Sequence, residues 1–193
     1  MSRNPFPPLR TPATVPAVVI RPCVPGDEAA LALVGQASFL EAFAGVLPGS
    51  DILAHCERQH AAAVYHGWLR DGVSALWLAE TEPGGAPVGY LVLTRPDLPL
   101  PELGSGDVEV KRVYLLHRFQ GGGLGRRLMQ AAEDHARGCG RRRLLLGVYA
   151  RNADAIGFYQ RLGYRPVGTR TFLVGHHRYD DLILGRDLHA APA

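Results

Sequence analysis

Apolar and polar positions change several times along the chain between the two-residue spacing of strands and the spacing of helices. Apolar, β-branched runs predict seven strands. They are expected at residues 17–22, 74–80, 88–94, 108–116, 143–150, 165–174 and 179–186. The turn-rich segment EPGGAP predicts a hairpin between the second and third strands. The apolar run RLLLGVYA is typical of a strand that is buried on both faces.

Capping residues and apolar spacing predict helices between these strands. Asp27 is a plausible N-cap for a helix that reaches residue 43, and Ser50 or Asp51 can cap a second helix that runs to Leu69.

The second half of the chain has two further helix signals. From Leu124 to Cys139 apolar residues recur at helical spacing. Asn152 can cap a helix over ADAIGFYQRL, and Gly163 can end it in the left-handed conformation. The order is strand, two helices, three strands, helix, strand, helix and two strands. It predicts one compact α/β domain with a mixed sheet and helices on both faces.

Composition places this domain in residues 17–193. Residues 1–16 are rich in proline and have no apolar run, so we expect a disordered tail that folding does not need. The chain has no transmembrane-length or signal-peptide segment, and its three distant cysteines suit reduced thiols, which indicates a cytoplasmic protein that binds no membrane. The net charge of +3 comes from scattered arginines, so we expect no nucleic-acid partner.

The segment QGGGLGRRL, residues 120–128, breaks two local rules at the start of a predicted helix. Glycine raises the entropy cost of folding, and arginines in a first turn face the positive end of the helix dipole. An anionic ligand on the free N–H groups would resolve both conflicts. The segment matches neither the nucleoside-triphosphate loop nor the dinucleotide fingerprint, so we expect another phosphate-bearing cofactor.

Two motifs in this region resemble those of one family. The run VYLLHRFQGGGLGRRL resembles motif A of the GNAT superfamily of N-acetyltransferases, whose pattern [QR]-x-x-G-x-[GA] is met by Gln120, Gly123 and Gly125. The run LGVYARNADAIGFYQRLGY resembles motif B. Within the superfamily, SFLEAFAGVLPGSDI and GTRTFLVGHHRYDDLIL are similar to segments of bacterial PaiA-type polyamine acetyltransferases. The resemblance implies a GNAT-like fold with a mixed, mostly antiparallel central sheet.

The resemblance also implies an acetyl-CoA site without a metal. The pyrophosphate would lie on the N–H groups of Gln120, Gly121, Gly122, Gly123, Leu124, Gly125 and Arg126. The strand at Val113, Tyr114 and Leu115 would splay from its neighbour and pair with the pantetheine arm. Asn152 and Ala155 would flank that arm, and Tyr159 would reach the thioester sulfur.

Direct acetyl transfer to an amine needs a base for the ammonium and an acid for the departing thiolate. Tyr159 is the expected acid, and Glu109 is the expected base, acting directly or through water. Each has a structural alternative: Tyr159 can be plain core, and Glu109 can be a strand carboxylate that faces water. Asn152 can be only an N-cap, and either Arg126 or Arg127 can contact phosphate.

We therefore expect an N-acetyltransferase that acts on the primary amine of a small molecule, which can be polyamine-like. One alternative is an acetyltransferase for the α-amine or lysine of a protein. A non-catalytic acyl-CoA sensor is the other. A homodimer is compatible with the sequence. His55, Cys56, His60 and His66 do not repeat a zinc-ligand spacing, so no metal is expected.

Overall fold

The computed structural model describes residues 16–174 and 177–188, which contain a seven-stranded sheet in the order β1-β2-β3-β4-β5-β7-β6. Its strands are β1 (Ala17–Pro22), β2 (Ala75–Glu82), β3 (Pro87–Thr94), β4 (Asp107–Leu115), β5 (Arg143–Tyr149), β6 (Arg165–Val174) and β7 (His177–Asp187). Neighbouring strands are antiparallel except for the parallel pair β4–β5. This confirms the predicted mixed, mostly antiparallel sheet. The predicted tail, residues 1–16, lies outside the described residues apart from Pro16.

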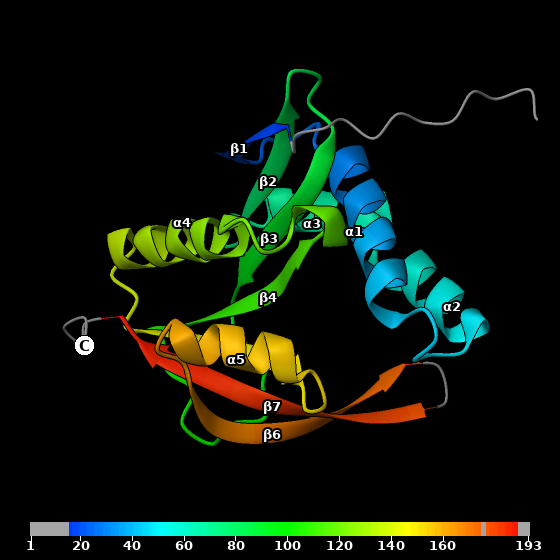
Figure 1. The fold of residues 1–193 in the computed structure, drawn as a ribbon. Helices are drawn as coiled ribbons and strands as arrows, with labels where there is room; N and C mark the ends of the chain where they lie inside the picture. The colour runs from blue at the N-terminus through cyan, green and yellow to red at the C-terminus, as the bar shows by residue number, and fades with distance from the viewer. Residues whose placement is uncertain (1–15, 175–176, 189–193) are drawn as a thin grey trace, which may run out of the picture.

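Helices cover both faces of the sheet (Figure 1). They are α1 (Glu28–Phe43), α2 (Gly49–Gln59), α3 (Ala62–Arg70), α4 (Leu124–Gly138) and α5 (Ala153–Arg161), with a short 3-10 helix η1 (His117–Phe119) before α4. The main core cluster joins α4 and α5 to one face through residues such as Leu128, Met129 and Tyr159. A second cluster joins α1 and α3 to the other face through Leu31 and Tyr65. No helix in the described part of the chain is long and apolar enough to cross a membrane.

The predicted helix from residue 50 to Leu69 is in fact two helices, α2 and α3, separated at His60 and Ala61. The break lets the His60 side chain turn inward, where its Nδ1 lies 2.8 Å from Oη of the fully buried Tyr65. Both groups fit against α1 because Gly35 has no Cβ, which would overlap them. The expected caps are also wrong, because α2 begins after Pro48 without a side-chain cap.

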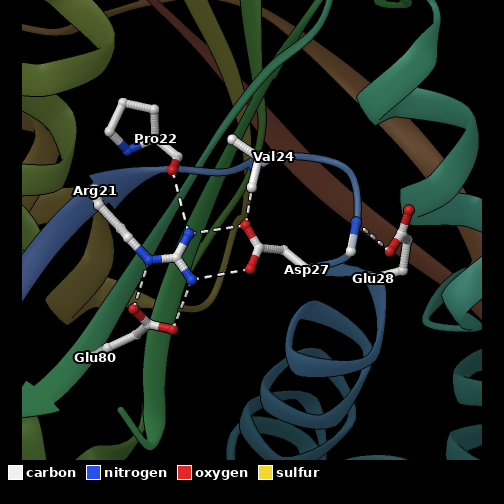
Figure 2. A network of polar contacts seen from close by, with 7 residues as sticks. Arg21, Pro22, Val24, Asp27, Glu28 and Glu80 are labelled. Carbon is white, nitrogen blue, oxygen red and sulfur yellow. Dashed lines mark hydrogen bonds and ion pairs between the residues drawn. The ribbon is translucent and has the colours of Figure 1, made fainter.

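Asp27 precedes α1 as expected, but its carboxylate does not cap the helix. It accepts hydrogen bonds from Arg21 at 2.8 and 2.9 Å and from the N–H of Val24 at 2.8 Å. Figure 2 shows that Arg21 also donates hydrogen bonds to Glu80 of β2, and their lengths are 2.7 and 2.9 Å. This clamp ties β1 and β2 to the start of α1.

The predicted boundaries of α5 are confirmed. Asn152 Oδ1 accepts a hydrogen bond from the N–H of Ala155 at 3.0 Å, and Gly163, just past the helix, has a φ of +89°. Such a cap satisfies one of the N–H groups that a helix leaves unpaired in its first turn.

An opening between β4 and β5 positions the site. The two strands pair only from Asp107–Val110 to Arg143–Leu146. Lys111 forms a bulge, because Val92 pairs with Arg112 while Leu93 pairs with Val110. Beyond it, β4 has no β5 partner, whereas β5 remains paired with β7 as far as Tyr149. In Figure 1 β4 accordingly rises away from β7.

Candidate active site

The glycine-rich segment joins the open end of β4 to α4. Gly121 and Gly123 have φ values of +79° and +82°, a region that glycine enters without strain. No atom lies within 4 Å of a Cβ built on Gly121, Gly122 or Gly123, so this side of the backbone is open. The side chain of Gln120 donates to the carbonyl of Leu115 at 3.0 Å, which fixes the loop to the strand. The loop therefore presents open backbone beside the free N–H groups of a helix start, as a phosphate site requires.

Gly125 has a different role from the glycines before it. A Cβ at this position would lie 3.3 Å from Cζ of Phe158 on α5 and 3.7 Å from Cδ1 of Leu115. The absence of a side chain at Gly125 therefore lets α4 approach α5 and the end of β4 closely. The sequence predicts that this glycine lies against the pyrophosphate, and the geometry adds helix packing as a second reason for it.

The two arginines of the segment differ in their contacts. Arg127 donates from Nη1 to the carbonyl of Val18 on β1 at 3.3 Å. Arg126 is exposed and has no polar partner among residues 16–174 and 177–188. Arg126 is therefore the arginine that is free to approach a phosphate.

Tyr159 lies on the face of α5 that packs into the main core, beside the opening. Its side chain is 8% exposed, and its Oη has no hydrogen-bond partner in the described structure. Burial, and then the nearby Tyr114 phenol, raise the pKa of Tyr159 well above its usual value. The hydroxyl therefore keeps its proton at neutral pH and is free to donate it to a ligand.

Glu109 is almost completely buried, with 1% of its surface exposed, so it is not a strand carboxylate that faces water. Its Oε2 accepts a hydrogen bond from the N–H of Asp97 at 2.7 Å, and Oε1 lies 3.3 Å from Nζ of Lys111. Glu109 pairs in register with Leu145, which packs on the sheet face away from α4 and α5. Glu109 thus lies at the closed end of the opening, on the face opposite Tyr159.

The residues expected to line the pantetheine arm border the opening. Val113, Tyr114 and Leu115 pair with β3 and have no β5 partner, so their second edge can accept an extended ligand. The Tyr114 ring stacks on Tyr90 with centroids 6.0 Å apart, and burial raises its pKa to about 12. Ala155 packs against the main core from α5.

On the sheet face opposite α4 and α5, a hydrophobic cluster forms a bridge between two groups of elements. Phe39 of α1 and Ile52 of α2 form a cluster with Leu47, and Phe172 of β6 and Tyr179 of β7 pack against it. This bridge connects the helices beside β4 with the strands beyond β5. The cluster therefore places aromatic side chains beside the opening on this face of the sheet.

Sequence reasoning missed Arg112, a half-buried cation on this face of β4, and the partners of Glu109, Asp97 and Lys111. The only sequence signal for Arg112 is its position three residues after Glu109 on a predicted strand. His55 stacks on Phe39 with centroids 4.1 Å apart, and His60 is hydrogen-bonded to Tyr65. Within the described ranges no three His, Cys, Asp or Glu side chains are grouped as metal ligands would be.

Comparison with known proteins accounts for this arrangement. Residues 45–164 match the model of the acetyltransferase (GNAT) family. The chain belongs to this family. It is therefore an N-acetyltransferase, and acetyl-CoA-dependent N-acetylation is the activity that this membership supports.

Three similar proteins illustrate the relationship. An uncharacterized N-acetyltransferase of Mycobacterium tuberculosis is 31% identical over 162 residues, which cover 84% of this chain and 98% of the relative. The L-methionine sulfoximine/L-methionine sulfone acetyltransferase of Salmonella typhimurium is 36% identical over 84 residues, or 42% of this chain and 49% of that enzyme. The crystal structure of the PaiA N-acetyltransferase of Thermoplasma acidophilum in complex with coenzyme A superimposes with a TM-score of 0.73 and 18% identity. That match covers 89% of this chain and 99% of that one.

Proposed function

We propose that this protein transfers the acetyl group of acetyl-CoA directly to the primary amine of a small molecule. The observation on which the proposal rests is the opening between β4 and β5. It ends at the unobstructed glycines before α4, and it has Tyr159 on one side and Glu109 on the other.

The chain's residues fit acetyl-CoA along this opening. Open backbone at Gly121–Gly123 and the free Arg126 suit the pyrophosphate. The unpaired edge of Val113–Leu115 suits the amides of the pantetheine arm. Asn152 and Ala155 lie at the start of α5 and would flank that arm. The unpartnered Oη of Tyr159 suits the sulfur.

The chemistry divides between two residues. Acetyl-CoA supplies an activated acetyl thioester. A primary ammonium has a pKa of about 10.4, so near pH 7 it must lose a proton before its nitrogen can attack the carbonyl carbon. Glu109 accepts that proton, directly or through a water. As the C–N bond forms and the C–S bond breaks, Tyr159 donates its Oη proton to the departing thiolate, and the second proton that the nitrogen loses restores the tyrosine hydroxyl. The net reaction releases one proton.

Two features favour a small acceptor over a protein. The bridge between α1–α2 and β6–β7 bounds the acceptor face, whereas a polypeptide substrate needs an open groove. The Salmonella relative is named for small acceptors, derivatives of methionine. A polyamine-like acceptor stays a prediction.

The proposal is tested by incubating the full chain with acetyl-CoA that carries an isotope label in the acetyl group. An amine panel of amino acids, simple alkylamines and spermidine is compared with a peptide panel by mass spectrometry. The proposal predicts labelled N-acetyl products of small amines. Products from peptides alone would establish the protein acetyltransferase instead, and binding of acetyl-CoA without any product would indicate the sensor.

A further inference from the structure

Arg112 is a half-buried cation on the acceptor face of β4, and the protein gives it only neutral partners. Its Nη1 donates to Tyr65 Oη at 3.2 Å, and its Nη2 donates to Gln59 Oε1 at 3.4 Å. The guanidinium carbon lies 4.8 Å from the ring centre of Trp68 and 5.5 Å from that of Tyr65. Within residues 16–174 and 177–188, no carboxylate lies within 4.0 Å of it.

The other half-buried arginines of the described structure have a carboxylate or a carbonyl oxygen as a partner. Five of them form ion pairs with carboxylates: Arg21, Arg137, Arg143, Arg170 and Arg186. Arg141 donates to the carbonyl of Ser105. Because a partly desolvated charge is normally paired, Arg112 is the half-buried guanidinium here that lacks an anion or a carbonyl. An anionic ligand would supply the missing partner.

The residues around Arg112 are neutral and leave its positive charge uncompensated. Tyr65 Oη accepts from Arg112 and shares a hydrogen bond with Nδ1 of His60 at 2.8 Å, so one hydroxyl contacts both groups. Burial, and then Arg112, lower the pKa of His60 to about 3. Burial, and then Arg112 and Arg58, lower the pKa of His55 to about 4. Both imidazoles are therefore neutral near pH 7, and Arg112 is the charged group among these side chains.

Arg112 lies within reach of the reaction centre. It follows the bulge at Lys111 in the part of β4 that has left β5. Tyr114 is two residues further along the same face, which corresponds to about 7 Å along a strand. Burial raises the pKa of the Tyr114 phenol, and the nearby charge of Arg112 opposes that rise. Glu109 lies on this same face, on the other side of the bulge. The Glu109 carboxylate, which Lys111 Nζ approaches at 3.3 Å, and the Arg112 guanidinium thus flank the place where the proposed function has the amine react.

We propose that the acceptor amine also carries a carboxylate, as an α-amino acid does, and that Arg112 binds this carboxylate. Glu109 then faces the ammonium of one zwitterion, and Arg112 faces its carboxylate. The nitrogen and the carboxyl carbon of such a molecule are both bonded to the α-carbon. The planar guanidinium forms paired hydrogen bonds with a carboxylate. This inference rests on the proposed acetyl transfer to small amines and names the class of acceptor.

The test uses three acceptors that differ only at this group: L-methionine, L-methioninamide and 3-(methylsulfanyl)propylamine, with spermidine as a fourth. The unbranched thioether side chain suits an aromatic lining such as Phe39 and Phe172. Steady-state kcat/KM for acetyl transfer is measured with the wild-type chain and the Arg112→Gln and Arg112→Lys variants. Arg58→Gln is the matched control, because Arg58 is exposed on α2 and its charge also acts on His55.

The ratio of kcat/KM for methionine to kcat/KM for the matched amine is compared between proteins, which cancels the intrinsic reactivity of each amine. Arg112→Gln is expected to lower this ratio by about 10- to 100-fold, mostly through the KM for methionine. The ratio for Arg112→Lys should lie between those of Arg112→Gln and wild type, because an ammonium keeps the positive charge but cannot form the paired hydrogen bonds of a guanidinium. Arg58→Gln should leave the ratio within about twofold, as expected for a screened surface charge.

The outcomes separate the two proposals. A purely structural role of Arg112 would lower the melting temperature and change all four acceptors equally, which would overturn the carboxylate site while acetyl transfer stands. Wild-type preference for spermidine or for the amine without a carboxylate would overturn it as well, even if the variants do not fold. Acetyl-CoA binding without transfer to any acceptor would overturn the proposed function and this inference together.

Discussion

A Cβ atom on Gly125 would lie 3.3 Å from Cζ of Phe158, so the first turn of α4 rests on the α5 ring. In an open helix, alanine in place of glycine stabilises by up to about 1 kcal/mol. Gly67→Ala in α3, where the site is exposed and open, should show that gain. Gly125→Ala should show little gain or a net loss, because α4 must move off Phe158. Denaturant unfolding checks this, and equal gains at the two positions would contradict the packing role.

Gly122 offers a cleaner probe of the phosphate site than Gly125. It has neither a positive φ nor an atom within 4 Å of its Cβ position, so glutamate can replace it without strain. Its carboxylate would stand where the phosphates are expected, and acetyl-CoA affinity should fall by roughly 10- to 100-fold, the loss of a charge-assisted contact. Calorimetric titration measures this. Gly67→Glu is the matched control, and the phosphate assignment fails if both variants bind acetyl-CoA like the wild type.

Arg126 and Arg127 can be separated by the same titration. Arg126 is exposed and unpartnered, whereas Arg127 donates to the Val18 carbonyl. Arg126→Gln should weaken acetyl-CoA binding by about three- to tenfold at low salt, and the effect should shrink as ionic strength rises. Arg127→Gln should change affinity less. The reverse order of effects would assign the phosphate contact to Arg127.

His60 makes stability depend on pH. Burial and Arg112 lower its pKa to about 3, so the folded protein keeps this imidazole neutral while the unfolded chain takes up a proton below about pH 6.5. The contribution of the neutral His60 to the free energy of unfolding is therefore fully present above pH 6.5. It is lost as the pH falls toward 3, by at most about 1.4 kcal/mol per pH unit for one proton.

His60→Gln should remove this contribution, so the slope of unfolding free energy between pH 4 and 6.5 should be shallower than in the wild type. The remaining slope includes His55, whose pKa is lowered to about 4. His117→Gln, at an exposed position in η1, is the control that should retain the wild-type slope. An unchanged slope in His60→Gln would mean that the buried imidazole is already charged.

Local patterns predicted most of the fold because they depend on local physics. The strand boundaries follow apolar runs, and α5 begins and ends at Asn152 and Gly163, whose capping geometry is a property of a few neighbouring residues. The prediction of one helix from residue 50 to Leu69 was wrong because the break at His60 depends on a contact with a distant segment. His60 and Tyr65 pack against Gly35 of α1.

The site was predictable where a motif fixes the backbone and unpredictable where distant segments meet. The open glycines follow from QGGGLGRRL, and the helix contact of Gly125 depends on Phe158, 33 positions later. Of the two partners of Glu109, Lys111 is on the same strand, whereas the N–H of Asp97 comes from the β3–β4 loop. Arg112 has only its place three residues after Glu109 on the strand as a local signal, because the neutral residues that surround it come from α2 and α3.

The kinetics of Tyr159→Phe test the central claim most directly. The variant keeps the ring and removes a hydroxyl that has no protein partner in the described structure, so folding and acetyl-CoA affinity should be nearly unchanged. Tyr164→Phe, which removes the buried unpartnered hydroxyl of the ring packed 5.9 Å away, is the matched control and should keep wild-type turnover. If Tyr159 protonates the leaving thiolate, kcat for its best amine should fall by about 10²- to 10⁴-fold in Tyr159→Phe. Wild-type turnover by Tyr159→Phe would contradict the account and leave Tyr159 as a core residue.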